Sequence, residues 1–198
     1  MSGEYVLYAL GGYLLGSFPS AFLTSRFLAR KDIRTTGSGN VGGMNAFRNV
    51  GVLPGILTAL LDAGKGALAV TLAKQVAGPG SAGLLAAMVA LVAAVLGHNY
   101  MLYLGFRGGK GLGASLGGIL VLWPAGVVYL LAALGLGIVL LRDGNAGTGA
   151  GVAMWPFVLW YHGQSLPWLW FGLAMAAVIL SRHLKDFAAY GHGRRQIV

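Results

Sequence analysis

Residues 81–104 read SAGLLAAMVALVAAVLGHNYMLYL, and this long apolar run decides the fold class. Its length is close to the ~20 residues that a transmembrane helix needs. The rest of the chain agrees, because 57% of the 198 residues are hydrophobic and only 10% are charged, with a mean hydropathy of +0.73. Soluble domains carry roughly a quarter charged residues. The sequence therefore predicts an all-α polytopic membrane protein with a single domain over residues 1–198.

Further apolar runs lie on both sides of this segment. Two precede it, at about 5–28 and 52–76, and the first lacks the basic start and cleavage site of a signal peptide. The run 112–141 is too long for one upright helix and is interrupted at 123–126, so we expect two helices there, the first one short. Shorter runs follow at about 150–162 and 166–181. This pattern predicts about seven transmembrane helices, two of them short, with five spans as the alternative.

Small residues recur four positions apart, as is typical of closely packed membrane helices. The pairs are Gly12 and Gly16, Gly51 and Gly55, and Gly113 and Gly117.

The distribution of lysine and arginine predicts the orientation of the chain in the membrane. With an external N-terminus and seven crossings, nearly all lysines and arginines of the loops fall on the cytoplasmic side, and only Lys74 falls outside. The cytoplasmic set is Arg26, Arg30, Lys31, Arg34, Arg48, Arg107, Lys110, Arg142, Arg182, Lys185, Arg194 and Arg195. The net charge of +9 then reflects cytoplasmic loops beside anionic lipid or substrate, and no nucleic-acid partner is expected. We expect a cytoplasmic C-terminus and polar chemistry gathered on that face.

The first polar loop, residues 35–51, reads TTGSGNVGGMNAFRNVG. Its segment 37–42 fits G-x-G-x-x-G, but no strand precedes it, so a dinucleotide site is rejected. Glycines still allow several N–H groups to converge on an anion, and Arg48 offers a bidentate grip on phosphate. The alternative is a flexible turn with an arginine at the lipid surface.

The second polar loop, residues 97–113, reads GHNYMLYLGFRGGKGLG. It is not a strict P-loop, because residue 104 is Leu and no Ser or Thr follows Lys110. It remains a lysine among glycines at an expected helix start, which suits a phosphate. The alternative is a basic anchor at the membrane interface, although such an anchor does not need these glycines.

Other chemistry is restricted by what the chain lacks. It has no cysteine, no H-x-x-x-x-D and no zinc-like spacing, so no metal is expected. Asp62 and Lys65 lie three apart in one helix and can pair, either structurally or beside a site. A lone histidine such as His98 is more often a structural hydrogen-bonding group than a catalyst.

Several motifs together resemble one family, the small integral-membrane acyl-phosphate:glycerol-3-phosphate acyltransferases of bacteria, often called PlsY. The matching segments are GSGNVGGMNAFRNVG at 37–51, DAGKG at 62–66, GHN at 97–99, FRGGKG at 106–111 and RH at 182–183. Their order and the chain length match along essentially the whole sequence. Each motif alone is weak evidence for the family, whereas the combination of motifs is specific.

The resemblance implies transfer of a fatty acyl group from acyl phosphate to the 1-hydroxyl of glycerol 3-phosphate. It implies lysophosphatidic acid and phosphate as products, no cofactor, a multi-pass protein of the bacterial plasma membrane and an active site facing the cytoplasm. We take Lys110, Arg48 and His183 as candidate catalytic residues, although the base could equally be His98 or a substrate phosphate oxygen. The candidate substrate-binding residues are Ser38, Gly39, Asn40, Asn45, His98, Asn99, Gly108, Gly109, Arg142 and Asn145.

The chain departs from the family pattern at some of these positions. The usual GSGNPGATN is GSGNVGGMN here, Met101 stands where a proline is expected, and Asp186 stands near the asparagine expected after the terminal RH. Two alternatives therefore stay open: a paralogue with another acyl acceptor, and a small transporter of anions or phosphate esters. The expected partners are acyl phosphate, glycerol 3-phosphate and membrane lipid, and the expected oligomeric state is a monomer.

Overall fold

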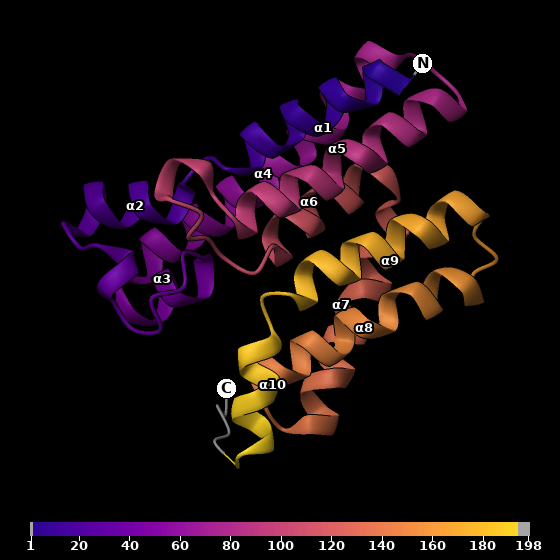
Figure 1. Ribbon diagram of the computed structural model, residues 1–198. Helices are drawn as coiled ribbons and strands as arrows, with labels where there is room; N and C mark the ends of the chain where they lie inside the picture. The colour runs from indigo at the N-terminus through magenta and orange to yellow at the C-terminus, as the bar shows by residue number, and fades with distance from the viewer. Residues whose placement is uncertain (1, 194–198) are drawn as a thin grey trace. The chain divides into compact units, whose positions relative to one another are not determined.

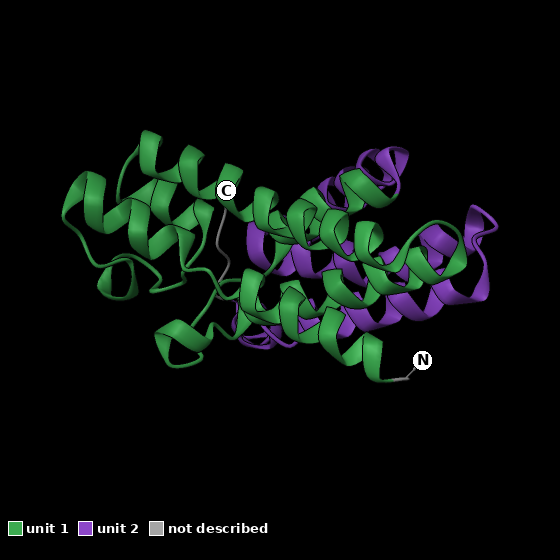
Figure 2. Ribbon diagram, turned by 90° about the horizontal axis from the view of Figure 1, so that it is seen from above, with its two compact units in different colours: residues 1–122 green, residues 123–198 purple. Residues whose placement is uncertain are grey.

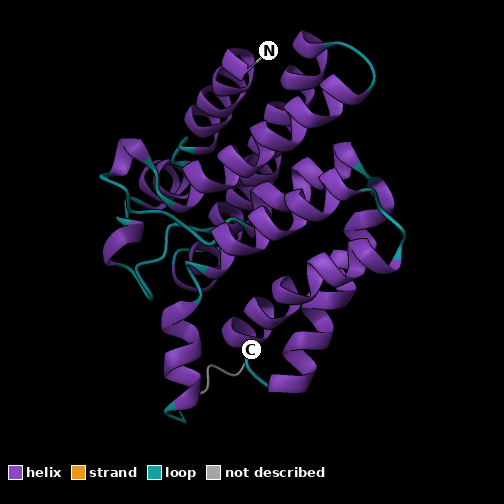
Figure 3. Ribbon diagram, turned by 45° about the vertical axis from the view of Figure 1, so that its right-hand side comes forward, coloured by secondary structure: helices purple, strands orange, loops and turns teal. Residues whose placement is uncertain are grey.

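The computed structural model describes residues 2–193 and contains only helices and loops over that range (Figure 3). Figure 1 shows the helices in chain order, and Figure 2 shows the two compact units, residues 1–122 and 123–198. Two of the cations assigned to the cytoplasmic face, Arg194 and Arg195, lie outside the described residues. Each unit has its own packed helices.

The first unit is built around the two long apolar helices α4 and α5. The α-helices of this unit are α1 (Ser2–Gly16), α2 (Ser20–Ala29), α3 (Gly43–Asn49), α4 (Val52–Ala77), α5 (Ser81–Asn99) and α6 (Leu112–Leu122). Two short 3₁₀ helices, η1 (Ile33–Thr35) and η2 (Leu102–Leu104), lie in the connections. Both polar loops therefore belong to this unit, the first between α2 and α4 and the second between α5 and α6.

Glycines bring the helices of the first unit into close contact. A side chain added at Gly12 or Gly16 would collide with the main chain of α5 at Ala90 and Ala94. A side chain at Gly117 would collide in the same way with Ala63 of α4. The packing expected from small residues four apart is therefore confirmed for α1 against α5 and for α6 against α4.

The second unit contains α7 (Pro124–Leu141), α8 (Gly144–Tyr161), α9 (Leu166–Leu180) and α10 (Leu184–Gly191). Gly147 of α8 lies against the main chain of Ile138 in α7, and Gly151 lies against Leu134. Trp123 packs beside Tyr129 and His162, with ring centroids 5.6 and 5.7 Å away. Close glycine contacts and tilted or edge-on contacts between aromatic rings thus hold this unit together.

The expected helices are present, with differences at several boundaries. The predicted break at 123–126 is confirmed, because α6 ends at Leu122 after only 11 residues and α7 begins at Pro124. The first apolar run is broken at 17–19, where Pro19 precedes α2. The run expected at 150–162 begins earlier, because Asp143 caps α8 at Gly144, so this helix has 18 residues and is not short.

Four segments of the described chain are long and apolar enough to span a membrane. These are Gly3–Ala29, Val52–Ala77, Ser81–Leu104 and Pro124–Leu141. The bent pair Leu166–Leu180 and Leu184–Gly191 gives a fifth if it is counted as one span, and Leu112–Leu122 is a shorter apolar helix. The chain is therefore an all-helical protein with several apolar spans.

Candidate active site

Asn45, at the start of α3, organises the first polar loop. Its Nδ2 donates to the main-chain oxygens of Thr36 and Asn40, both at 2.9 Å. Its Oδ1 accepts from the Ser38 main-chain nitrogen at 3.3 Å and from Asn49 Nδ2 at 2.9 Å. Only 5% of Asn45 is exposed, so its amide is enclosed by these partners. Asn45 therefore fixes the shape of the loop through hydrogen bonds in both directions.

A second brace holds the beginning of this loop. Asp32 caps η1 by accepting from the Arg34 main-chain nitrogen at 3.0 Å, and Arg34 Nη2 lies 2.7 Å from Asp32 Oδ2. Hydrogen bonds from Arg34 lower the pKa of Asp32 to about 2, so this carboxylate is ionised at neutral pH. Lys31 Nζ also donates to the main-chain oxygen of Asn49 at 3.1 Å, which ties the loop's entry to the end of α3.

The second polar loop folds back onto the end of α5. Gly109 donates its N–H to the His98 main-chain oxygen at 3.0 Å. A side chain at Gly108 would collide with the main-chain oxygen of His98, and one at Gly109 would collide with the His98 imidazole. This close approach explains why glycines precede Lys110, which is half-buried two residues before α6 begins.

The two polar loops also meet each other. Val41 of the first loop donates its N–H to the Gly108 main-chain oxygen of the second loop at 3.4 Å. Val41 is 1% exposed and packs in a small core with Ile33 and Met101. This bond links the two loops that carry the candidate residues of the first unit. They are Ser38, Gly39, Asn40 and Asn45 in the first loop, and His98, Asn99, Gly108, Gly109 and Lys110 in the second.

Beneath the second loop lies a buried charged group. Lys65 Nζ is 3.0 Å from Asp62 Oδ1, and His98 Nδ1 is 3.4 Å from the same oxygen. Lys65 Nζ also donates to the main-chain oxygen of Phe18 at 3.0 Å. The predicted pairing of Asp62 with Lys65 is therefore confirmed, and His98 joins it as a third member.

The polar residues of the second unit gather at the start of α8. Asp143 Oδ1 accepts from the main-chain nitrogens of Asn145 and Ala146, at 2.9 and 2.7 Å. His183 Nδ1 lies 3.0 Å from the Ile179 main-chain oxygen, and His183 Nε2 lies 3.4 Å from Thr148 Oγ1. Because a carbonyl oxygen can only accept, His183 Nδ1 is the donor in the bond to Ile179.

The candidate residues differ in exposure. Ser38, Arg48 and Arg142 are exposed, whereas His98, Asn99 and His183 are buried. Arg142 ends α7 with a left-handed backbone, at φ 50°. Sequence reasoning missed Thr148 beside His183, for which the sequence gives no signal. It also missed Asp143 as a helix cap, although an aspartate just before a helical run is a recognisable start signal.

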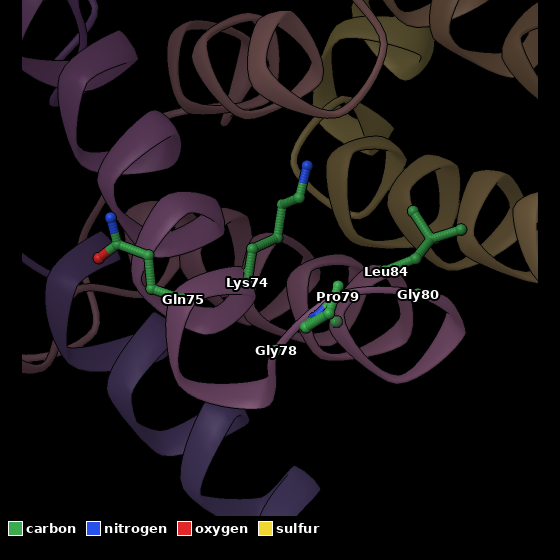
Figure 4. A pocket seen from close by; sticks show the side chains of 7 residues that line it. Lys74, Gln75, Gly78, Pro79, Gly80 and Leu84 are labelled. Atoms are coloured by element: carbon green, nitrogen blue, oxygen red, sulfur yellow. The ribbon is translucent and has the colours of Figure 1, made fainter.

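A hollow of about 430 Å³ lies at the turn between α4 and α5 (Figure 4). It is lined by Lys74, Gln75, Gly78, Pro79, Gly80, Gly83 and Leu84. The hollow is at the end of α4, whereas the first polar loop precedes its beginning, and a helix of 26 residues is about 39 Å long. The hollow is therefore separate from the candidate site.

Comparison with known proteins gives a consistent result. The family model described as glycerol-3-phosphate acyltransferase matches residues 6–193. The glycerol-3-phosphate acyltransferase of Synechococcus sp. (strain JA-3-3Ab) is 38% identical over 91% of this chain and 87% of its own. Glycerol-3-phosphate acyltransferase 1 of Moorella thermoacetica is 39% identical over 92% of this chain and 89% of its own.

Two solved structures share the fold. They are crystal structures of PlsY, described as an integral membrane glycerol 3-phosphate acyltransferase, in its glycerol 3-phosphate form and its lysophosphatidic acid form. Their TM-scores are 0.82 and 0.80, with 25% and 26% identity, and each covers 98% of this chain; the alignments cover 95% and 94% of the PlsY chains. On the family match and on these relatives, the chain belongs to the glycerol-3-phosphate acyltransferase family that includes PlsY.

Proposed function

We propose that this protein is a membrane acyltransferase that uses acyl phosphate to acylate the 1-hydroxyl of glycerol 3-phosphate. The observation that carries the proposal is the contact between Val41 and Gly108, which joins the two glycine-rich loops beside Lys110. Family membership and the glycerol 3-phosphate and lysophosphatidic acid forms of PlsY support the acceptor and the product.

Both substrates carry phosphate, and the proposed site has cations for two anionic groups. In this proposal Arg48 and the Ser38–Asn45 loop hold one phosphate, and Lys110 with its flanking glycines holds the other. Main-chain N–H groups of glycine-rich turns and a planar guanidinium both suit phosphate oxygens. Asn45 acts mainly by shaping its loop, because its side-chain amide is enclosed by main-chain and Asn49 partners.

The proposed reaction is a direct acyl transfer. The 1-hydroxyl oxygen attacks the acyl carbon, a new ester C–O bond forms, and the bond from the acyl carbon to the phosphate oxygen breaks, so phosphate leaves with the electron pair. Since phosphate is a good leaving group, positioning and charge stabilisation provide most of the catalysis. The hydroxyl proton goes to a base, for which His183 stays the candidate, with a substrate phosphate oxygen as the alternative. His98 is instead held by Asp62 and by Gly109.

The proposal also gives the cellular membrane in which the protein lies and its topology there. Residues 1–198 form one membrane domain in the bacterial plasma membrane, with an external N-terminus, about seven crossings and a cytoplasmic C-terminus. The excess of lysine and arginine in the expected cytoplasmic loops supports this orientation. The acyl chain reaches the site from the lipid between helices, and the protein acts as a monomer.

The alternatives give different predictions for the same site. A paralogue with another acceptor would keep the acyl-phosphate chemistry and lose the dependence on glycerol 3-phosphate. A transporter of phosphate esters would bind the same anions without releasing phosphate. Family membership favours an enzyme over a transporter.

Phosphate release by the purified protein in bicelles tests the proposal. With acyl phosphate and glycerol 3-phosphate both present, we expect phosphate release that requires both substrates. With acyl-CoA in place of acyl phosphate, we expect no release of free CoA thiol. Lys110→Ala should lower the rate by about 10²-fold or more, because a positioned charge at the developing oxyanion is removed. Lys74→Ala, which changes an exposed lysine at the far end of α4, is the matched control. Transport without phosphate release would overturn the proposal.

A further inference from the structure

The buried group formed by Lys65, Asp62 and His98, here called the Asp62 triad, is not used by the reaction described above. It lies inside the first unit, where Asp62, Lys65 and His98 are 3%, 6% and 2% exposed. Charged side chains in a membrane interior are costly and mark functional positions. A buried ion pair is often no more stabilising than apolar residues of similar size, so stability alone does not account for it.

The triad is connected to three separate segments of the chain. Lys65 Nζ donates to Phe18 at the break between α1 and α2, at 3.0 Å. Asp62 Oδ1 lies 3.4 Å from His98 Nδ1, close to the end of α5. His98 in turn accepts the Gly109 N–H through its main-chain oxygen at 3.0 Å, and its ring faces Gly109 from the other side.

Asp62 also borders the helix that follows Lys110. A side chain at Gly113, in the first turn of α6, would lie 3.0 Å from Asp62 Cβ. The main chain is therefore braced on both sides of Lys110, by His98 at Gly109 and by Asp62 at Gly113. Gly111 between them lies against the Asn99 side chain, where an added Cβ would be 2.8 Å from Oδ1.

We infer that Asp62 is a positioning residue: by holding His98, it fixes the Gly108–Gly111 segment and so the position of the Lys110 ammonium. Asp62 does not touch substrate in this account. Its role in turnover rests on the proposed function of Lys110, whereas its role in ordering the loop does not. A carboxylate or amide oxygen at residue 62 is sufficient for the task, because it only has to lie beside His98 Nδ1, which is 3.4 Å from Asp62 Oδ1.

Two double variants separate the effect of the side-chain oxygen at residue 62 from the effect of the charges. Asp62→Asn/Lys65→Met and Asp62→Leu/Lys65→Met both remove the ion pair and the bond to Phe18, so neither leaves an unpaired charge. Only the asparagine keeps an acceptor for His98. Hydrogen–deuterium exchange of residues 105–111 and kcat/KM are measured on both, together with the melting temperature in detergent.

We expect the leucine variant to show exchange of residues 105–111 faster by about 10-fold than the asparagine variant, at a similar melting temperature. Its kcat/KM should fall by about 10-fold or more, because small misplacements of a binding group are costly. Equal exchange in the two variants would overturn the inference. So would a uniform rise in exchange over the whole first unit.

A single variant covers the case in which the leucine variant does not fold. His98→Leu keeps the Asp62–Lys65 pair and removes the ring beside Gly109, so it should loosen residues 105–111 in the same way. Full protection of this segment in His98→Leu would overturn the inference. If the wild-type protein releases no phosphate while the exchange pattern is as expected, the proposed function fails and the positioning role of Asp62 stands.

Discussion

Asn45 donates a hydrogen bond from Nδ2 to the main-chain oxygen of Asn40, at 2.9 Å, within the first polar loop. The same nitrogen bonds Thr36, and Oδ1 of the same side chain accepts from Ser38. One buried amide thus sets the path of the glycine-rich segment between η1 and α3. A loop held in this way presents its N–H groups in a fixed arrangement, which favours anion binding over a flexible turn.

Asn45→Ala should therefore disorder the first loop. The variant leaves several main-chain groups without their side-chain partner, and we expect a loss of about 1–3 kcal/mol in the free energy of unfolding. Thermal unfolding in detergent measures this loss, and the KM for glycerol 3-phosphate should rise in parallel. Asn49→Ala removes one bond to Oδ1 and should have a smaller effect. Equal effects of the two substitutions would contradict the central role of Asn45.

Gly109→Ala should disable the second loop without unfolding the protein. The added methyl group would collide with the His98 imidazole and lie 2.9 Å from the Val41 main-chain oxygen. We expect kcat/KM to fall by about 10²-fold, because Lys110 is displaced. Gly64→Ala is the control, since nothing lies within 4 Å of a Cβ there. Wild-type kinetics in Gly109→Ala would show that this close approach does not matter for turnover.

Gly12→Leu should destabilise the first unit. A side chain at this position collides with the Ala90 main chain, so α1 and α5 must separate, at a cost of about 1–3 kcal/mol or more. The neighbouring Gly11 has nothing within 4 Å of an added Cβ and offers a matched control of identical chemistry. Melting temperatures of Gly12→Leu and Gly11→Leu are compared in the same detergent. A drop in both, or in neither, would contradict the packing described for α1 and α5.

His183→Asn tests the proposed base. Asparagine can still donate to the Ile179 main-chain oxygen from the position of Nδ1, but it has no atom at the position of Nε2. We expect kcat to fall by about 10²- to 10⁴-fold with little change in KM, as is typical when a general base is lost. Thr148→Val removes the neighbouring hydroxyl and should lower kcat less. An unchanged kcat in His183→Asn would transfer the role to a substrate phosphate oxygen.

The apolar pattern predicted most of the fold. Runs of about 20 apolar residues mark α4 and α5, and Trp123-Pro124 marks the break between α6 and α7, because proline cannot continue a helix. The spacing of Gly12 and Gly16 predicted close helix packing. The break at 17–19 was missed, because the apolar run continues through it. Helix α3 was missed because its seven residues, GMNAFRN, have too little apolar periodicity.

The sequence indicated which segments form the candidate site, but not how these segments contact one another in space. Glycines around Lys110 indicated an anion loop, and Asp62 and Lys65 indicated a pair by their spacing. Nothing in the sequence places His98 beside Asp62, because the contact joins α4 to α5 over 36 residues. The bond from Val41 to Gly108 is equally non-local. Such contacts depend on tertiary packing, which a pattern within one helix does not contain.

Product formation tests the central claim most directly. The purified wild-type protein is given acyl phosphate and isotopically labelled glycerol 3-phosphate, and the lipid products are identified by mass spectrometry, with the acyl position assigned by fragmentation. The account predicts labelled 1-acyl lysophosphatidic acid in an amount equal to the phosphate released, and nearly none with Lys110→Ala. Phosphate release without labelled lysophosphatidic acid, or equal product from Lys110→Ala, would contradict it.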